Sequence, residues 1–215
     1  AQQAPSATQA ESDRPDHIRT LLSTAERHFL ARGYQKASLD EIGEEARVGR
    51  GTLYRHFGAK AGLFDATLRA MAQRIAQAAA PQEIPEGDAR IVLPPFLERA
   101  ADHLTSPESI ALHRAAIEES RRAPELALAI YEMVRQPWAD ALAVWLQRNS
   151  QLCADDAQWC ALQTLTLATL GNRPFASGQI MDASSRQEAA RRAAAILRGG
   201  FLDALTDEAA QRPAT

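Results

Sequence analysis

The sequence of 215 residues has no apolar run as long as the ~18 residues that a membrane-spanning helix needs. Its first residues, AQQAPSATQAESDRPD, are polar and contain no apolar signal-peptide core. We therefore expect a cytoplasmic protein that has no membrane partner.

Cysteine and the motifs of common enzymes are scarce as well. The two cysteines, Cys153 and Cys160, are seven residues apart, which suits neither a zinc knuckle nor a redox CxxC pair. His103 and His113 have no third ligand at a regular spacing, so we expect no metal site. The sequence also lacks a nucleophile elbow and a phosphate-binding loop. We expect no cofactor and no enzymatic activity.

Strand patterns are missing too, because no stretch alternates polar and apolar residues and no internal repeat is visible. Hydrophobic residues make up 46% of the chain and charged residues 24%, which is a globular composition. Alanine and leucine together heavily outnumber the β-branched residues. These features predict an all-α protein.

An excess of positive charge is absent from the whole chain but present in its first part. The formal net charge is -3. The stretch from Arg14 to Ile75 holds 11 Lys and Arg residues against 7 Asp and Glu residues, whereas from Ala76 onward there are 13 against 18. A locally basic segment favours a nucleic-acid partner for that segment.

The first part of the chain shows helical periodicity in four segments. An apolar stripe that starts at Asp16 predicts a helix ending at Gly33. Ser38 is expected to cap a short second helix, and Glu41, three residues later, would complete a capping box. Breaks at residues 47–49 and at residue 58 then separate a short third helix from a fourth that starts near Lys60.

The rest of the chain predicts five more helices, and the turn-rich segment PQEIPEGD precedes them. Pro137 falls inside the longest one and should bend it. The expected helices span 91–104, 107–121, 124–145 and beyond, 155–170 and 184–205. The expected organisation is a disordered tail (1–15), a first helical domain (16–60), a connecting helix (61–80) and a C-terminal helical domain (88–208).

The segment LDEIGEEARVGRGTLYRHFGAKAGLF has the spacing of a helix-turn-helix. Apolar Ile42, Val48 and Leu53 would fill the seam between two short helices, and small Gly43 and Ala46 would let these helices cross closely. The outer side of the second helix would then be able to enter a major groove of DNA.

Within this segment, GTLYRHFGAKAGLF resembles the signature of the tetracycline-repressor (TetR) family, and the likeness covers about Asp16 to Leu68. In that family the third helix is the recognition helix, and the fourth joins the DNA-binding head to the ligand-binding body. The resemblance implies DNA contacts by Ser38, Arg50, Gly51, Thr52, Tyr54, His56 and Lys60.

The chemistry of the side chains is consistent with such contacts. Arg50 and Arg55 carry guanidinium forks suited to guanine, and Thr52 can offer a methyl group to thymine. Tyr54 and Lys60 suit phosphate oxygens. For Arg55 a solvated surface charge remains an alternative, and His56 could instead cap or pack within the head.

The sequence departs from the family pattern at the turn between the two short helices. Arg47 stands where glycine is usual, which would cost ~1–2 kcal/mol if the backbone there is left-handed. Gly49 stands where a serine usually caps the third helix, and glycine is an accepted but weaker cap.

The segment ALHRAAIEESRRAPELALAIYE resembles, less specifically, the C-terminal domain of the AefR-type subgroup. This resemblance implies a dimer face made mostly by the last two helices, whose alanines permit close packing. The expected interface residues are Leu162, Leu165, Thr169, Ala194, Leu197 and Phe201. Packing within one chain is the alternative for this surface.

An apolar effector pocket between the C-terminal helices is harder to place. Trp138 and Trp145 share a helix face at seven-residue spacing. The candidate pocket residues are His113, Ile117, Trp138, Trp145, Trp159 and Cys160, and for each of them ordinary core packing is the alternative.

These observations predict a ligand-responsive transcriptional regulator. The expected mechanism is a homodimeric repressor that a small apolar effector releases from a palindromic double-stranded DNA operator. The alternative is a helical small-molecule carrier without a DNA function, which leaves the basic charge of the first segment unexplained.

Overall fold

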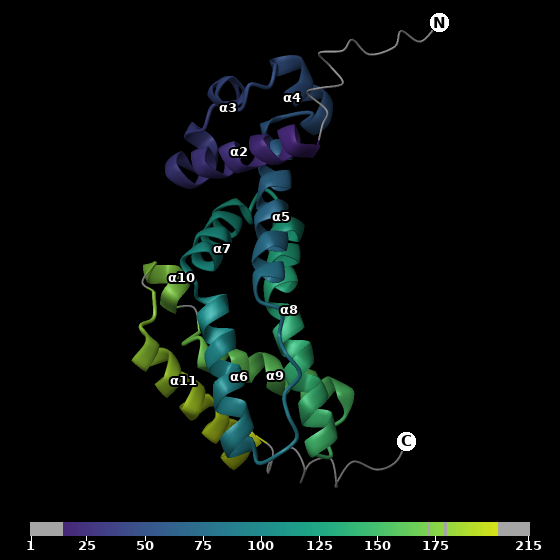
Figure 1. Cartoon of the computed structure of the whole chain (residues 1–215), viewed down its shortest axis with the longest axis vertical. Helices are drawn as coiled ribbons and strands as arrows, with labels where there is room; N and C mark the ends of the chain where they lie inside the picture. The colour runs from purple at the N-terminus through teal and green to yellow at the C-terminus, as the bar shows by residue number, and fades with distance from the viewer. Residues whose placement is uncertain (1–14, 172, 179, 202–215) are drawn as a thin grey trace, which may run out of the picture. The chain divides into compact units, whose positions relative to one another are not determined.

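The computed structural model describes residues 15–171, 173–178 and 180–201. Within these ranges the chain is all-α and contains no β-strand, as the sequence predicts (Figure 1). The expected disordered tail lies outside the described residues except for Pro15, and so does the stretch 202–208 of the expected C-terminal domain. None of the described helices combines the length and the apolar character that crossing a bilayer takes.

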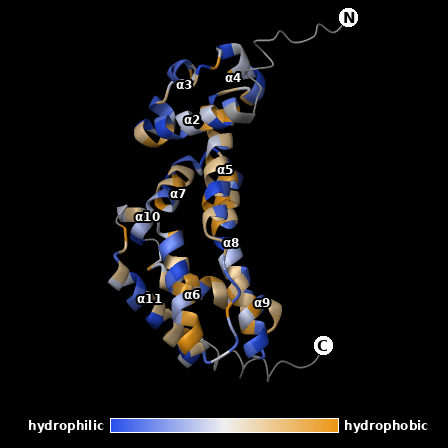
Figure 2. Ribbon diagram, in the orientation of Figure 1, coloured by the Kyte–Doolittle hydropathy of each residue, from blue (hydrophilic) through white to orange (hydrophobic). Residues whose placement is uncertain are grey.

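The helices agree closely with the segments expected from periodicity, and each carries both hydrophobic and hydrophilic residues (Figure 2). The short α10 has no counterpart in the sequence prediction, and a single π-helical turn, η1, follows the last α-helix. In chain order they are α2 (Pro15–Lys36), α3 (Leu39–Ala46), α4 (Arg50–Phe57), α5 (Lys60–Ala78), α6 (Ala89–Leu104), α7 (Pro107–Glu119), α8 (Pro124–Asn149), α9 (Ala154–Ala168), α10 (Arg173–Ser177), α11 (Ala183–Ile196) and η1 (Leu197–Phe201).

The chain divides into two compact units. Unit 1 comprises the residues up to Arg74 together with Ala115–Ile130, and unit 2 comprises Ile75–Arg114 and the residues from Tyr131 onward. The chain therefore passes from one unit to the other inside α5, α7 and α8. These units are defined by packing alone, and the functional domain limits given above remain a prediction.

Unit 1 has an aromatic centre that joins α2 to α5. The ring of Phe64 meets the ring of Phe29 edge-on at 4.9 Å and the ring of Tyr34 at 5.0 Å, between centroids. Such edge-to-face pairs are favourable beyond the area they bury. At the other end of α5, the Arg74 guanidinium donates two hydrogen bonds to the Glu26 carboxylate, at 2.8 and 3.0 Å. Both contacts hold α2 against α5.

Glycine interrupts α2 at the expected position. Gly33 has φ 72° and ψ 167°, a conformation outside the helical region that glycine adopts without steric cost. One further turn then continues to Lys36. This turn places Tyr34 against Phe64 in the aromatic centre.

Unit 2 is built around α11, which packs against both α6 and α9. The buried side of α11 consists of Ala189, Ala190, Ala193 and Ala194, and such small side chains let helix axes approach closely. Asp182 caps α11 by accepting hydrogen bonds from the Ser184 hydroxyl at 2.7 Å and the Ser185 backbone N–H at 2.8 Å. These bonds lower the pKa of Asp182 to about 2.

Candidate nucleic-acid interface

The crossing of α3 and α4 depends on one glycine. Ile42, Val48 and Leu53 are buried in the seam between these helices, as the sequence predicts. A Cβ atom on Gly43 would lie 2.9 Å from the Val48 carbonyl oxygen, closer than real Cβ contacts, and 3.0 Å from Leu53 Cδ1, which is tighter than most of them. The absence of a side chain at Gly43 therefore sets how closely α4 lies against α3.

The turn between the two helices has a left-handed residue that is not glycine. Arg47 has φ 56° and ψ 38°, and its backbone N–H donates to the Glu44 carbonyl oxygen at 3.2 Å. The next residue, Val48, donates to the Gly43 carbonyl oxygen at 2.8 Å. The turn thus keeps the geometry that glycine usually provides, at a cost of ~1–2 kcal/mol.

The N-terminus of α3 has the serine cap that the sequence predicts, and α4 begins after a glycine. Ser38 Oγ accepts a hydrogen bond from the Glu41 backbone N–H at 3.4 Å, and Gly49 precedes α4 without a side-chain cap. The Glu41 carboxylate forms an ion pair with Arg32 of α2. Glu41 therefore joins α3 to α2 through its side chain, a contact that a capping box does not include.

The outer side of α4 presents polar and basic groups. Arg50, Gly51, Tyr54, Arg55 and His56 are exposed, Thr52 is half-buried, and α4 contains no acidic residue. An exposed helix face of this composition suits the edges and phosphates of DNA.

Two of these side chains on α4 are already arranged relative to each other. The Arg50 guanidinium lies over the Tyr54 ring, 5.6 Å from its centroid, and 3.6 Å from the Asp40 carboxylate of α3. The hydrogen bond with Tyr54, and secondarily the charge of Asp40, raise the pKa of Arg50. Arg50 lies at the start of α4 with Asp40 as a competitor for its interactions.

Lys60 has a structural partner in the head. Its amino group donates to the Gln35 carbonyl oxygen at 3.0 Å and lies 5.0 Å from the centroid of the Tyr34 ring. An amino group placed at the C-terminal end of a helix satisfies a carbonyl oxygen that has no partner within that helix, and it interacts favourably with the helix dipole. Lys60 thus fixes the end of α2 against the start of α5, and its predicted phosphate contact stays a prediction.

A cation that sequence reasoning missed, Arg122, joins the α7–α8 turn to the rest of unit 1. Its guanidinium donates to Asp65 at 2.9 Å and to Glu119 at 2.9 Å. It also lies 5.0 Å from the Tyr34 centroid and 5.9 Å from the Phe64 centroid. Apart from the bond to Glu119, three positions away, these contacts link residues far apart in sequence, and no local pattern indicates them.

The candidate pocket residues do not share one environment. His113, Trp138, Trp145 and Cys160 are buried in unit 2, whereas Trp159 is 50% exposed and Ile117, in unit 1, is 61% exposed. The Trp138 ring packs against Phe96 and His103, and Trp145 Nε1 donates to the Pro85 carbonyl oxygen at 3.0 Å.

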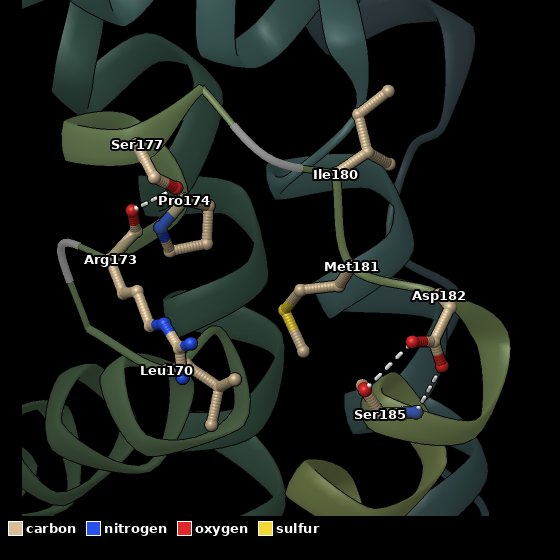
Figure 3. A pocket seen from close by; sticks show the side chains of 8 residues that line it. All are labelled: Leu170, Arg173, Pro174, Ser177, Ile180, Met181, Asp182 and Ser185. Carbon is tan, nitrogen blue, oxygen red and sulfur yellow. Dashed lines mark hydrogen bonds between the residues drawn. The ribbon is translucent and has the colours of Figure 1, made fainter.

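A different pocket lies beside α10 and the start of α11 (Figure 3). None of the six candidate pocket residues belongs to its lining. Figure 3 shows the Asp182 cap and the bond from the Ser177 hydroxyl to the Arg173 carbonyl oxygen at this pocket. The lining residues are Leu170, Arg173, Pro174, Ser177, Ile180, Met181, Asp182 and Ser185.

Most of the candidate interface residues pack inside their own chain. Leu165, Thr169, Ala194 and Leu197 are each 5% exposed or less, and Leu162 is half-buried. The side chain of Phe201 lies outside the described residues. The large apolar side chains that α9 and α11 leave exposed are others: Trp159, Leu167, Leu170 just beyond α9, and Ile196.

Comparison with known proteins agrees with this architecture. Residues 21–67 match the family described as bacterial regulatory proteins, tetR family, and residues 92–198 match the AefR-like transcriptional repressor, C-terminal domain. A three-helix head with a helix-turn-helix, joined in one chain to a helical body, defines a class of DNA-binding transcriptional regulators. The chain belongs to the TetR family of these regulators.

Solved structures share the fold at low sequence identity. A TetR-family regulator from Mesorhizobium loti MAFF303099 is 19% identical, with a TM-score of 0.70, covering 89% of this chain and 97% of that one. A TetR-family regulator from Pseudomonas syringae pv. tomato str. DC3000 is 22% identical, with a TM-score of 0.63 and coverages of 88% and 97%. The flavonoid-responsive regulator FrrA is 22% identical, with a TM-score of 0.61 and coverages of 89% and 97%. A search of curated protein sequences found no significant match.

Proposed function

We propose that this protein is a homodimeric repressor that binds a palindromic operator through α4 and is released by a small, largely apolar effector. The observation that carries the proposal is the outer side of α4, where Arg50 and Tyr54 are exposed and paired on a helix without acidic residues. A protein with this role works in the cytoplasm, and no catalytic role is proposed. The flavonoid-responsive name of FrrA is consistent with effector binding in this fold.

DNA binding is tested by fluorescence anisotropy with DNA from upstream of the protein's own gene. Arg50→Gln should weaken binding by about 5- to 100-fold, the range for a lost base contact of ~1–3 kcal/mol. Asp40→Asn should strengthen binding, because it removes both the competitor for Arg50 and a negative charge near the phosphates.

The matched control is Arg148→Gln, which breaks an exposed ion pair with Glu83 at 2.6 Å in unit 2 and should leave DNA affinity unchanged. The wild-type affinity should also fall steeply with salt concentration, because phosphate contacts release counterions. Affinity that is insensitive to salt, or equal in Arg50→Gln and wild type, would contradict the assignment of α4.

Dimerisation is supported by the apolar side chains that α9 and α11 expose. Trp159 and Leu167 of α9 are 50% and 38% exposed, and Leu170, two residues beyond the end of α9, is 43% exposed. Ile196 of α11 is 44% exposed. Exposed apolar side chains on adjacent packed helices suit a symmetric interface between two copies.

Sedimentation velocity tests this interface. Leu167→Glu should shift the protein from dimer to monomer, because the two-fold symmetry of the dimer would place two carboxylates in the apolar contact. The control is Leu128→Glu in unit 1, where the leucine is 57% exposed and the variant should remain dimeric. Equal oligomeric states of the two variants would place the interface elsewhere.

A further inference from the structure

Unit 2 contains a buried arginine, Arg135 of α8, that is only 4% exposed. Its Nη2 donates to the Thr166 hydroxyl of α9 at 2.8 Å, and its guanidinium lies 5.6 Å from the centroid of the Tyr131 ring. Its buried Nε has no hydrogen-bond partner. Among the described residues, no aspartate or glutamate pairs with Arg135, which is rare for a buried charge.

The groups around Arg135 satisfy few of its hydrogen-bond donors and none of its charge. A guanidinium has five N–H donors and a full positive charge. The Thr166 hydroxyl, which itself donates to the Leu162 carbonyl oxygen at 2.8 Å, accepts one bond and contributes no charge. Burial lowers the pKa of Arg135, which expresses the cost of keeping the charge out of water.

A histidine beside the Tyr131 ring supplies no negative charge to Arg135. His113 of α7 is buried, and its ring lies 6.1 Å from the Tyr131 ring, between centroids. Burial first, and the charge of Arg135 in addition, lower the pKa of His113, while its hydrogen bond to the Ser109 carbonyl oxygen at 2.7 Å opposes the shift. At neutral pH the cluster of Arg135, His113, Tyr131 and Thr166 therefore carries one uncompensated positive charge.

We propose that Arg135 is the anion-binding group of the effector site and that the effector is a monocarboxylate with an apolar body. The guanidinium fork matches a carboxylate in two parallel hydrogen bonds. One carboxylate neutralises the single charge of the cluster, whereas a phosphate monoester would bring nearly two negative charges. The aromatic rings of Tyr131 and His113 suit the apolar body of the ligand. This inference rests on the proposed ligand response and specifies its chemistry.

Thermal unfolding of the full chain tests the inference without DNA. Octanoate and benzoate are the probes, and octanamide and benzamide, which have the same bodies without the charge, are the matched ligand controls. A carboxylate at ten times its Kd should raise the melting temperature of the wild-type protein by roughly 3–6 °C. The amides and inorganic phosphate should not raise it.

Two variants separate ligand binding from a structural role of the arginine. Arg135→Met should abolish the carboxylate response and should raise the melting temperature of the ligand-free protein, because it removes an uncompensated buried charge. Arg148→Gln, on the same helix but exposed and paired with Glu83, should keep the full response. A ligand-free Arg135→Met protein that melts below wild type would mean that the guanidinium has its counter-ion within the protein, and the inference would be wrong.

The DNA assay distinguishes failure of this inference from failure of the proposed function. Octanoate or benzoate should weaken binding of the wild-type protein to its upstream DNA but leave binding by Arg135→Met unchanged. If the wild-type protein binds this DNA and neither carboxylate changes its melting temperature, the inference is wrong and the proposed function stands. If it binds no DNA but responds to a carboxylate through Arg135, the site stands and the repressor function is wrong.

Discussion

Replacing Gly62 with alanine should unfold the head at a lower temperature, although alanine is the better helix former. Gly62 lies in the first turn of α5, where an added Cβ atom would lie far inside van der Waals contact of the Phe57 carbonyl oxygen and 3.1 Å from the Phe57 carbonyl carbon. Both are backbone atoms, so no side-chain rotation can relieve the overlap. The turn at Gly58, which has φ 71°, would have to move.

The size of the effect follows from two opposing terms. Alanine should gain ~1 kcal/mol over glycine through helix propensity, and forced overlap with the backbone should cost ~3 kcal/mol. The net loss of about 2 kcal/mol corresponds to a fall in melting temperature of roughly 4–8 °C. Thermal unfolding followed by circular dichroism measures it.

Two other glycines of the head complete a graded series. Gly51→Ala, in α4, meets no atom within 4 Å, so it should raise the melting temperature by roughly 1–4 °C through propensity alone. Gly43→Ala should fall between the two, because its Cβ would meet one backbone oxygen at 2.9 Å and one flexible leucine carbon at 3.0 Å. A Gly62→Ala protein that melts at or above the wild-type temperature would refute the steric explanation.

Three further substitutions test other contacts by the same unfolding assay. Arg47→Gly should stabilise the head by about 0.5–1 kcal/mol, because relief of ~1–2 kcal/mol of left-handed strain exceeds the entropy cost of glycine; no gain would contradict the strained turn. Arg122→Gln should destabilise unit 1 by about 1–2 kcal/mol. Asp65→Asn should cost less stability in the Arg122→Gln variant than in the wild-type protein, and additive losses would show that the two residues are not coupled. Asp182→Asn should lower the melting temperature at neutral pH, because the cap acts as a carboxylate whose folded pKa is lowered to about 2. The difference in melting temperature from wild type should vanish as pH falls from about 4 to about 2. A difference that persists at pH 2 would exclude the charge as its cause.

The head could be predicted from the sequence because its determinants are local. The apolar spacing of Ile42, Val48 and Leu53 fixes which sides of α3 and α4 meet, and Ser38 marks where α3 begins. The unusual residue at the turn, Arg47, was also visible as a departure from the family pattern, and it does adopt the left-handed conformation. Each of these inferences spans only a few residues, a range over which helix geometry is fixed.

The body could be predicted only as a set of helices. Periodicity located α9, but it could not show which apolar residues face the chain's own core, since Leu165 and Thr169 are buried and Trp159 and Leu167 are exposed on the same helix. A helix that is apolar on two sides carries no sequence signal that separates a core face from an interface.

Contacts between distant residues were equally hidden. The bond from Arg135 to Thr166 joins residues 31 positions apart, and an arginine inside an apolar helical segment reads as a surface charge until its burial is known. The same holds for Arg122, which reaches Asp65 across 57 positions. Sequence reasoning therefore located the DNA-binding head but missed the buried Arg135 and the contact from Arg122 to Asp65.

The membership of residues 115–130 in unit 1 limits how this regulator can be cut or recombined. A fragment that ends at Arg74 would contain the whole helix-turn-helix but would leave Tyr34 and Phe64 without the Arg122 side chain that stacks on them. A chimaera built by grafting this head onto a foreign body would need to bring the α7–α8 turn along, or supply a residue that substitutes for Arg122. Unit 1, which contains the helix-turn-helix, is thus discontinuous in sequence, and an N-terminal fragment alone would lack part of its packing.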